Sequence, residues 1–142
     1  MKKFICLLAS LLLYNSPVEA DAEDTRTVIQ LSPKHRAMVL TEMREFLRGL
    51  QQISEALSRE DMDSVAGVAR SLGISMSQHM PAELKQALPQ GFRKLGHSVH
   101  SHFDQIALDA ESLGDSGHAL SQLAHTLSGC VSCHSMYQIR NE

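Results

Sequence analysis

The sequence predicts an all-α protein, and more specifically an antiparallel four-helix bundle. Two observations lead to this fold class. Apolar residues recur every three to four positions in four separate segments, which is the spacing of amphipathic helices. The segments are joined by short links rich in proline, glycine and polar residues, so neighbouring helices must run antiparallel and share one core.

The first predicted helix begins at Ser32-Pro33 and continues to about Ser58. Serine followed by proline is a favourable helix start, with an N-cap residue and then a proline at the first helical position. A polar turn over residues 58–61 follows. The second helix is weakened by its glycines and must stop before Pro81. The apolar stripes of these two helices are Leu40, Met43, Leu47, Leu50 and Leu57, and then Val65, Val68, Ala69, Leu72 and Met76.

Two further helices are predicted in the second half of the chain. Residues 81–91 form a connecting turn or a short helix. The third helix keeps its three-four alternation from Phe92 to Leu113 and ends at residues 114–117. Ser116 is the predicted cap of the fourth helix. The apolar stripe of that helix consists of Leu120, Leu123, Leu127, Cys130, His134 and Tyr137.

The fourth helix carries the most informative motif, Cys130-Val131-Ser132-Cys133-His134. In an exported protein, CxxCH is the attachment sequence of a c-type haem. Thiols three residues apart lie on the same side of a helix, so both can add to vinyl groups on one edge of a porphyrin. His134 is then the predicted proximal iron ligand. A redox dithiol or half of a zinc site is the alternative interpretation of CxxC. We expect one covalently attached haem c per chain.

Residues 1–20 have the pattern of a secretory signal peptide. Lys2 and Lys3 precede an apolar run, and a small-residue cleavage site ends at Ala20. The run is too short to span a bilayer, so we expect it to be removed, together with Cys6, and the protein to reach the periplasm without a membrane anchor. Residues 21–142 then form a single domain whose two cysteines serve the haem rather than a disulfide framework.

Charge excludes one class of partner. The chain has a formal charge of −3, and removal of Lys2, Lys3 and Glu19 with the leader takes away a net charge of +1, which leaves −4. A mildly acidic chain lacks the clustered Lys and Arg that bind nucleic acid.

A sixth iron ligand has to come from upstream of the motif, because only eight residues follow His134. The stripe of the fourth helix places the haem inside the bundle, and we expect the first helix to cover its opposite face. The residues that this helix displays there are Arg36, Leu40, Met43 and Leu47.

The CxxCH near the end of a helical domain, the Tyr137 that follows it, and the Arg36-x-x-x-Leu40-x-x-Met43 spacing resemble cytochrome c′ and its low-spin relatives, the class II c-type cytochromes. The resemblance covers essentially all of residues 21–142. It implies an exported monohaem protein, often a homodimer, that transfers electrons to and from redox partner proteins or binds nitric oxide or carbon monoxide.

The resemblance also assigns residues. Leu40 matches the residue that faces the vacant iron position in five-coordinate members, whereas low-spin relatives bind iron through a methionine on this helix. Met43, or less favourably Met38, is the candidate sixth ligand, and no protein ligand at all is the competing outcome. Arg36 either bonds a haem propionate or is a solvated first-turn residue.

Two departures from the family favour electron transfer over gas binding. Arg59-Glu60-Asp61 replaces the Pro-Tyr-Asp turn that often follows the first helix, and Gln138 stands where a basic residue is common. We do not expect an enzyme, because Leu40 and Met43 supply neither acid nor base. The cluster of His97, His100 and His102 is interpreted as exposed histidines of an amphipathic helix rather than as a metal site.

Overall fold

Most of the described chain is helical, and the helices lie close to their predicted positions. A computed structural model describes residues 23–142, so the predicted leader and its cleavage site after Ala20 lie outside the described residues. The elements in chain order are β1 (Thr27–Leu31), α1 (Pro33–Ser58), α2 (Met62–Ser71), α3 (Ile74–Ser77), α4 (Ala82–Ala87), α5 (Gln90–Leu113), α6 (Ser116–Met136) and β2 (Tyr137–Asn141).

The start of α1 and the end of α5 agree with the sequence analysis. The Ser32 hydroxyl accepts a hydrogen bond from the backbone N–H of His35, at 3.3 Å, and Pro33 is the first helical residue. Helix α5 ends at Gly114, which adopts the left-handed conformation with φ 63° that favours glycine. The predicted cap of α6 is wrong by one residue. Asp115 is the N-cap, and its carboxylate accepts from the N–H of His118 at 3.0 Å.

The second predicted helix is divided at Gly73, between α2 and α3. A Cβ atom at this position would lie 1.8 Å from Oδ1 of Asp104 on α5, so only glycine lets the backbone come this close. Oδ2 of Asp104 also accepts a hydrogen bond from the N–H of Ile74 at 3.0 Å. Contact with α5, rather than helix propensity alone, therefore ends α2 well before Pro81.

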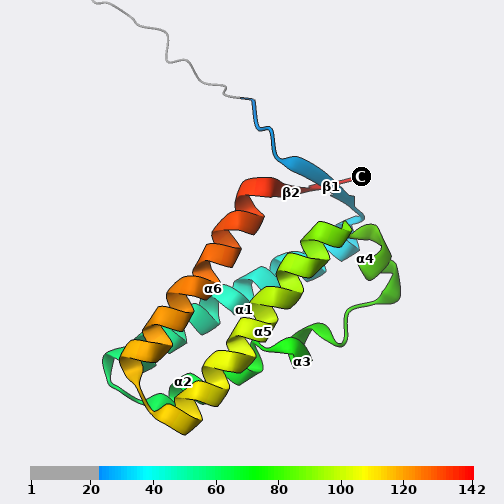
Figure 1. Ribbon diagram of the computed structural model, residues 1–142. Coiled ribbons are helices and arrows are strands. Elements are labelled where there is room, and N and C mark those ends of the chain that lie inside the picture. Colours follow the sequence, from blue (N-terminus) through cyan, green and yellow to red (C-terminus); the bar gives the residue numbers. More distant parts are fainter. Residues whose placement is uncertain (1–22) are drawn as a thin grey trace, which may run out of the picture.

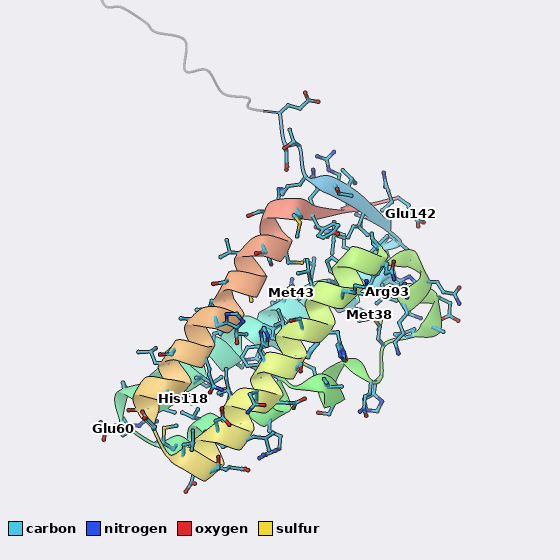
Figure 2. The ribbon with its side chains drawn as sticks, in the orientation of Figure 1. Met38, Met43, Glu60, Arg93, His118 and Glu142 are labelled. Atoms are coloured by element: carbon cyan, nitrogen blue, oxygen red, sulfur yellow. The ribbon has the colours of Figure 1, made fainter. Side chains whose placement is uncertain are left out.

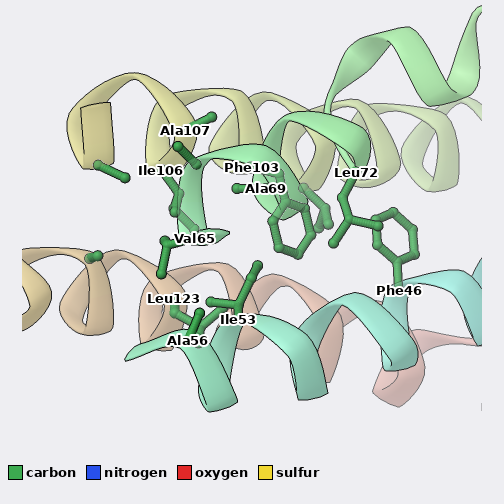
Figure 3. Close-up of a cluster of buried hydrophobic side chains, with 14 residues drawn as sticks. Phe46, Ile53, Ala56, Val65, Ala69, Leu72, Phe103, Ile106, Ala107 and Leu123 are labelled. Atoms are coloured by element: carbon green, nitrogen blue, oxygen red, sulfur yellow. The ribbon is translucent and has the colours of Figure 1, made fainter. Parts of the chain in front are cut away.

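The main core lies among α1, α2, α5 and α6 (Figure 3). Helix α2 packs against both α1 and α5, whereas α6 lies mainly against α5 and touches α1 only sparsely. Helices α5 and α6 form an antiparallel pair, and α1 runs behind them (Figure 1). The largest core residues without exposed surface are Ile53 of α1, Val65 of α2, and Phe103 and Ile106 of α5.

A two-stranded parallel sheet makes the all-α prediction too strict. Strand β1 pairs with β2 in register Thr27↔Tyr137 to Leu31↔Asn141, so the first and last described elements lie side by side (Figure 1). Ile29 and Leu31 point inward and are buried with Leu84 and Leu88, and Tyr137 and Ile139 pack on this second cluster. Each strand is only five residues long, and the two strands lie more than a hundred residues apart in the chain. The periodicity of either segment therefore does not predict that they pair.

Candidate functional site

The Cys-x-x-Cys-His motif occupies the last two turns of α6. Cys130 and Cys133 are both half-buried free thiols, and Cys130 packs against the main core. His134 is exposed. Because residues three apart lie on one side of a helix, the two thiols are presented together, as the motif predicts.

Burial sets the protonation of the two thiols. Burial raises the pKa of Cys130, and burial together with the neighbouring Cys130 sulfur raises the pKa of Cys133. A raised pKa keeps both as S–H groups at neutral pH. The pair is therefore protonated at neutral pH, unlike the low-pKa thiolates of redox dithiols.

The predicted apolar stripe of α6 is right for Leu123 and Cys130, and wrong for Leu120, Leu127 and His134. The buried row is Ala119, Leu123 and Thr126, followed by the half-buried Cys130 and Cys133. By contrast, Leu120 and Leu127 are exposed by 58% and 38%, and His134 is exposed as well. Tyr137 does not continue the helix, since it is the first residue of β2.

Small residues explain this rotation of α6. A Cβ atom on Gly129 would lie 3.2 Å from Cγ2 of Val99 on α5, so the two helices approach closely here. On the same flank of α6, the Gln122 amide donates to Asp109 of α5 at 2.6 Å. The small side chains allow this close packing, and the leucines that dominate the periodicity are left on the opposite flank.

The flank of α6 that turns away from α5 is apolar and partly uncovered. Its members are Leu120, Leu127, Val131 and His134, and Val131 is exposed by 65%. Helix α6 carries no Asp, Glu, Lys or Arg along its entire length. Apart from α5, the helix that α6 approaches is α1, and these two helices touch only sparsely.

Helix α1 presents a matching flank. Glu42 contacts α5 through His100, and Gly49 lies against Leu72 of α2, so these residues mark the side of α1 that is already packed. Beside this packed side, α1 carries Leu40, Met43 and Leu47, of which Leu47 is 68% exposed and the other two are half-buried. We call these two flanks together the α1–α6 seam: Leu40, Met43 and Leu47 with Leu120, Leu127, Val131 and His134.

The candidate ligands on α1 differ in where they point. Met43 packs at the edge of the main core, as Cys130 does from α6, and lies on the stretch of α1 seen between α5 and α6 in Figure 2. Met38 faces a different side of α1, where it lines a shallow hollow with Lys34, Ala37 and Thr41. Arg36 is half-buried in the first turn of α1, one turn before Leu40.

The α5 histidines do not form the predicted exposed cluster. His97 is exposed, but His100 is only 4% exposed, so the interpretation of His100 as a surface residue is wrong. His102 lies against His125 of α6, with ring centroids 4.8 Å apart. The sequence did contain a signal for His100, because it precedes Phe103, Ala107 and Ala110 at helical spacing on the buried face.

Gln138, one of the departures from the class II pattern, has a structural role. Its amide donates to the backbone carbonyl of Arg26 at 3.2 Å, and the Arg26 guanidinium donates to the backbone carbonyl of His134 at 3.3 Å. These bonds tie the end of α6 and the start of β2 to the residue before β1.

No protein-family model matches the chain, and no curated protein or solved structure is significantly similar to it. Within residues 23–142, no helix is both long enough and apolar enough to cross a membrane. The same part of the chain contains no group of three or more His, Cys, Asp or Glu side chains that could hold a metal ion.

Proposed function

We propose that this protein is an exported monohaem c-type cytochrome that transfers electrons, with haem attached to Cys130 and Cys133 and with His134 as the proximal iron ligand. The observation that carries the proposal is the position of the thiol pair. Both sulfurs are half-buried on the same side of α6, next to a sparsely packed and apolar α1–α6 seam. In this interpretation α1, α2, α5 and α6 are the four helices of a class II cytochrome bundle.

The residues present fit a haem group. A large exposed apolar patch usually marks a binding site. Leu127 and Val131 of α6 and Leu47 of α1 are exposed, and a flat apolar group bound in the seam would cover them. Each thiol can add its S–H across one vinyl double bond, forming a C–S bond and placing the hydrogen on the other vinyl carbon, so no electrons are lost. The haem iron, when bound, supplies one-electron redox chemistry.

The chain's own residues would then set the iron's surroundings. His134 is exposed and would turn its imidazole toward the haem iron, with the partly buried Leu40 and Met43 of α1 on the other side of the haem. A thioether ligand from Met43 would raise the reduction potential, and Arg36, one turn before Leu40, would donate to a haem propionate. We favour Met43 over Met38, because Met38 faces a different side of α1.

Covalent attachment is the direct test. The full chain is produced in a bacterial host that matures c-type cytochromes, and the purified protein is extracted with acidified acetone, which removes haem unless it is bound covalently. We expect the pigment to stay with the protein. Cys130→Ala and Cys133→Ala should each lose one thioether, which shifts the pyridine haemochrome band, and the double variant should lose the haem.

Ser132→Ala is the matched control, since Ser132 lies between the two cysteines, is exposed, and donates its hydroxyl to the backbone carbonyl of Ser128 on its own helix. This variant should retain both thioethers. Colourless protein from the competent host, or pigment that acidified acetone removes from the unaltered chain, contradicts the proposal.

The second candidate function is a five-coordinate binder of nitric oxide or carbon monoxide. The position of Leu40 favours it, because a leucine on the α1 flank of the seam cannot ligate iron and would shield an open coordination site. A ferrous spectrum that changes strongly on addition of carbon monoxide supports gas binding, whereas an unchanged low-spin spectrum supports the electron carrier.

Other parts of the proposal follow from the function and the leader. We place the carrier in the periplasm, with redox proteins as partners and a homodimer as its assembly. We assign it no nucleic-acid partner, no membrane anchor and no enzymatic reaction of its own.

A further inference from the structure

A second histidine arrangement lies on the opposite flank of α6 from the α1–α6 seam. His102 of α5 and His125 of α6 approach each other with ring centroids 4.8 Å apart and planes inclined by 51°. His125 is exposed and His102 is half-buried, so the pair lies at the edge of the α5–α6 contact. The two rings come from different helices, and neither is part of the Cys130-to-His134 motif.

One nitrogen of this pair lacks a partner. Nδ1 of His102 is buried and makes no hydrogen bond within the described chain, whereas Nε2 lies 3.5 Å from the Ser98 hydroxyl. A neutral imidazole carries one N–H and one lone pair. If the proton stays on Nε2, next to Ser98, the lone pair is on the orphaned Nδ1. Metal-binding histidines are commonly held this way, with the second nitrogen directed at a polar neighbour.

The separation of the rings suits a shared ion. Because Zn–N bonds are about 2.0–2.1 Å long, two imidazoles bound to one tetrahedral ion have ring centroids roughly 5 Å apart. One turn before His125 on the same helix, Oε1 of Gln122 is the second buried polar side-chain atom without a hydrogen bond in residues 23–142. Both orphaned atoms therefore belong to the α5–α6 pair.

We propose that His102 and His125 form a binding site for one divalent first-row transition-metal ion, with water completing the coordination. Imidazole nitrogens suit Zn²⁺, Ni²⁺ and Cu²⁺, and Cu²⁺ binds such sites most tightly. A metal bridge here links α5 to α6 independently of the haem, so the site does not depend on the function proposed above.

The test is calorimetric titration of the full chain with Zn²⁺ and Cu²⁺. The thiols must be blocked, by attached haem or otherwise by iodoacetamide, because free Cys130 and Cys133 would bind these metals themselves. We expect one equivalent to bind, Cu²⁺ more tightly than Zn²⁺. His102→Ala and His125→Ala should each weaken binding by at least about tenfold, a loss that even second-shell changes can cause.

The matched control is His97→Ala, which removes an exposed histidine of α5 that lies outside the pair. It should bind as tightly as the unaltered chain. A melting curve gives a second measurement, because an ion that binds only the folded state raises the melting temperature. The rise on adding Zn²⁺ should be absent from His125→Gln, whose exposed position leaves the fold intact.

Two results overturn the proposal. One is no saturable binding of either metal by the thiol-blocked chain. The other is binding that His97→Ala weakens as much as His102→Ala and His125→Ala do, since this would mean that metal is held by scattered surface histidines. Neither result bears on haem attachment, which the acetone extraction measures separately.

Discussion

Nε2 of His100 on α5 lies 3.1 Å from Oε1 of Glu42 on α1, and the two residues are 58 positions apart in the chain. The other ring nitrogen, Nδ1, lies 2.7 Å from the backbone carbonyl oxygen of Leu72. Both neighbours can only accept hydrogen bonds, so the imidazole satisfies both when it carries two protons. The pair ties α1, α5 and the end of α2 together beside the stacked rings of Phe46 and Phe103.

The His100–Glu42 contact predicts how stability changes with pH. Burial by itself lowers the pKa of His100, but the hydrogen bonds to Glu42 and Leu72 and the Glu42 charge outweigh it, and the pKa is raised above 6.5. A raised pKa means that the folded state binds the proton more tightly than the unfolded state does. The stabilisation is therefore complete below about pH 6.5 and is lost as the pH rises through the folded-state pKa.

Chemical denaturation at a series of pH values measures this loss. The free energy of unfolding should fall from about pH 6.5 upward, and Glu42→Gln should flatten the fall. Glu45→Gln is the control, because Glu45 pairs with Arg48 on the surface of α1 and should leave the slope unchanged. Equal slopes for all three proteins would show that His100 does not gain its proton from this contact.

Neighbouring residues of α5 should differ sharply in their contribution to stability. Ile106 has no exposed surface and lies in the core among α1, α2, α5 and α6, whereas Leu108 is 55% exposed. We expect Ile106→Ala to lower the free energy of unfolding by about 2–5 kcal/mol. Leu108→Ala should change it by no more than about 0.5 kcal/mol. Urea denaturation of both variants checks the difference, and similar losses would place the core on another face of α5.

The parallel sheet predicts a second pair of substitutions that should differ in their effect on stability. Leu31 of β1 points inward and is fully buried, whereas Val28 on the outer face of the same strand is 38% exposed. Leu31→Ala should cost roughly 2–5 kcal/mol because it leaves a cavity beside Leu84 and Leu88. Val28→Ala should stay within about 0.5 kcal/mol of the unaltered chain. A negligible loss for Leu31→Ala would mean that the strands do not contribute to the folded core.

The axial ligand can be tested in the haem-loaded protein by absorption in the ferric state. If Met43 binds iron, a sulfur-to-iron band near the red end of the spectrum should be present and should disappear in Met43→Ala. Met38→Ala is the control, since Met38 faces a different side of α1, and it should keep the band. Absence of the band from the unaltered chain, with a broad five-coordinate Soret shape, would instead favour the gas-binding function.

Helix positions were predictable because their signals are local. Ser32-Pro33 and Gly114 mark a start and an end through the geometry of their own residues, and the apolar period indicates the helices between such marks. The division at Gly73 was not predictable, since it depends on Asp104, which lies 31 residues further along the chain. The sheet was missed for the same reason, because its two strands stand at opposite ends of the described chain.

The candidate site divides in the same way. The i, i+3 placement of Cys130 and Cys133 follows from helical geometry alone, and so does the presence of Leu40 and Met43 on one side of α1. The side of α6 on which Cys130 and Cys133 are half-buried does not follow from helical geometry. The close approach of Gly129 to Val99 of α5 sets the rotation of α6 instead. The spacing of apolar residues predicts that the leucines of α6 are buried. Close packing instead buries the small residues, because they let two helices approach each other.

The amino-acid sequence by itself determined that the chain is mostly helical, where its long helices begin and end, and that two thiols and a histidine share the last turns of α6. Only the tertiary structure decided which flank of α6 is buried, which histidines meet, and that the two ends of the described chain pair as strands. Helical period and capping act between residues a few positions apart, but burial and pairing depend on contacts between distant segments, which local spacing does not encode.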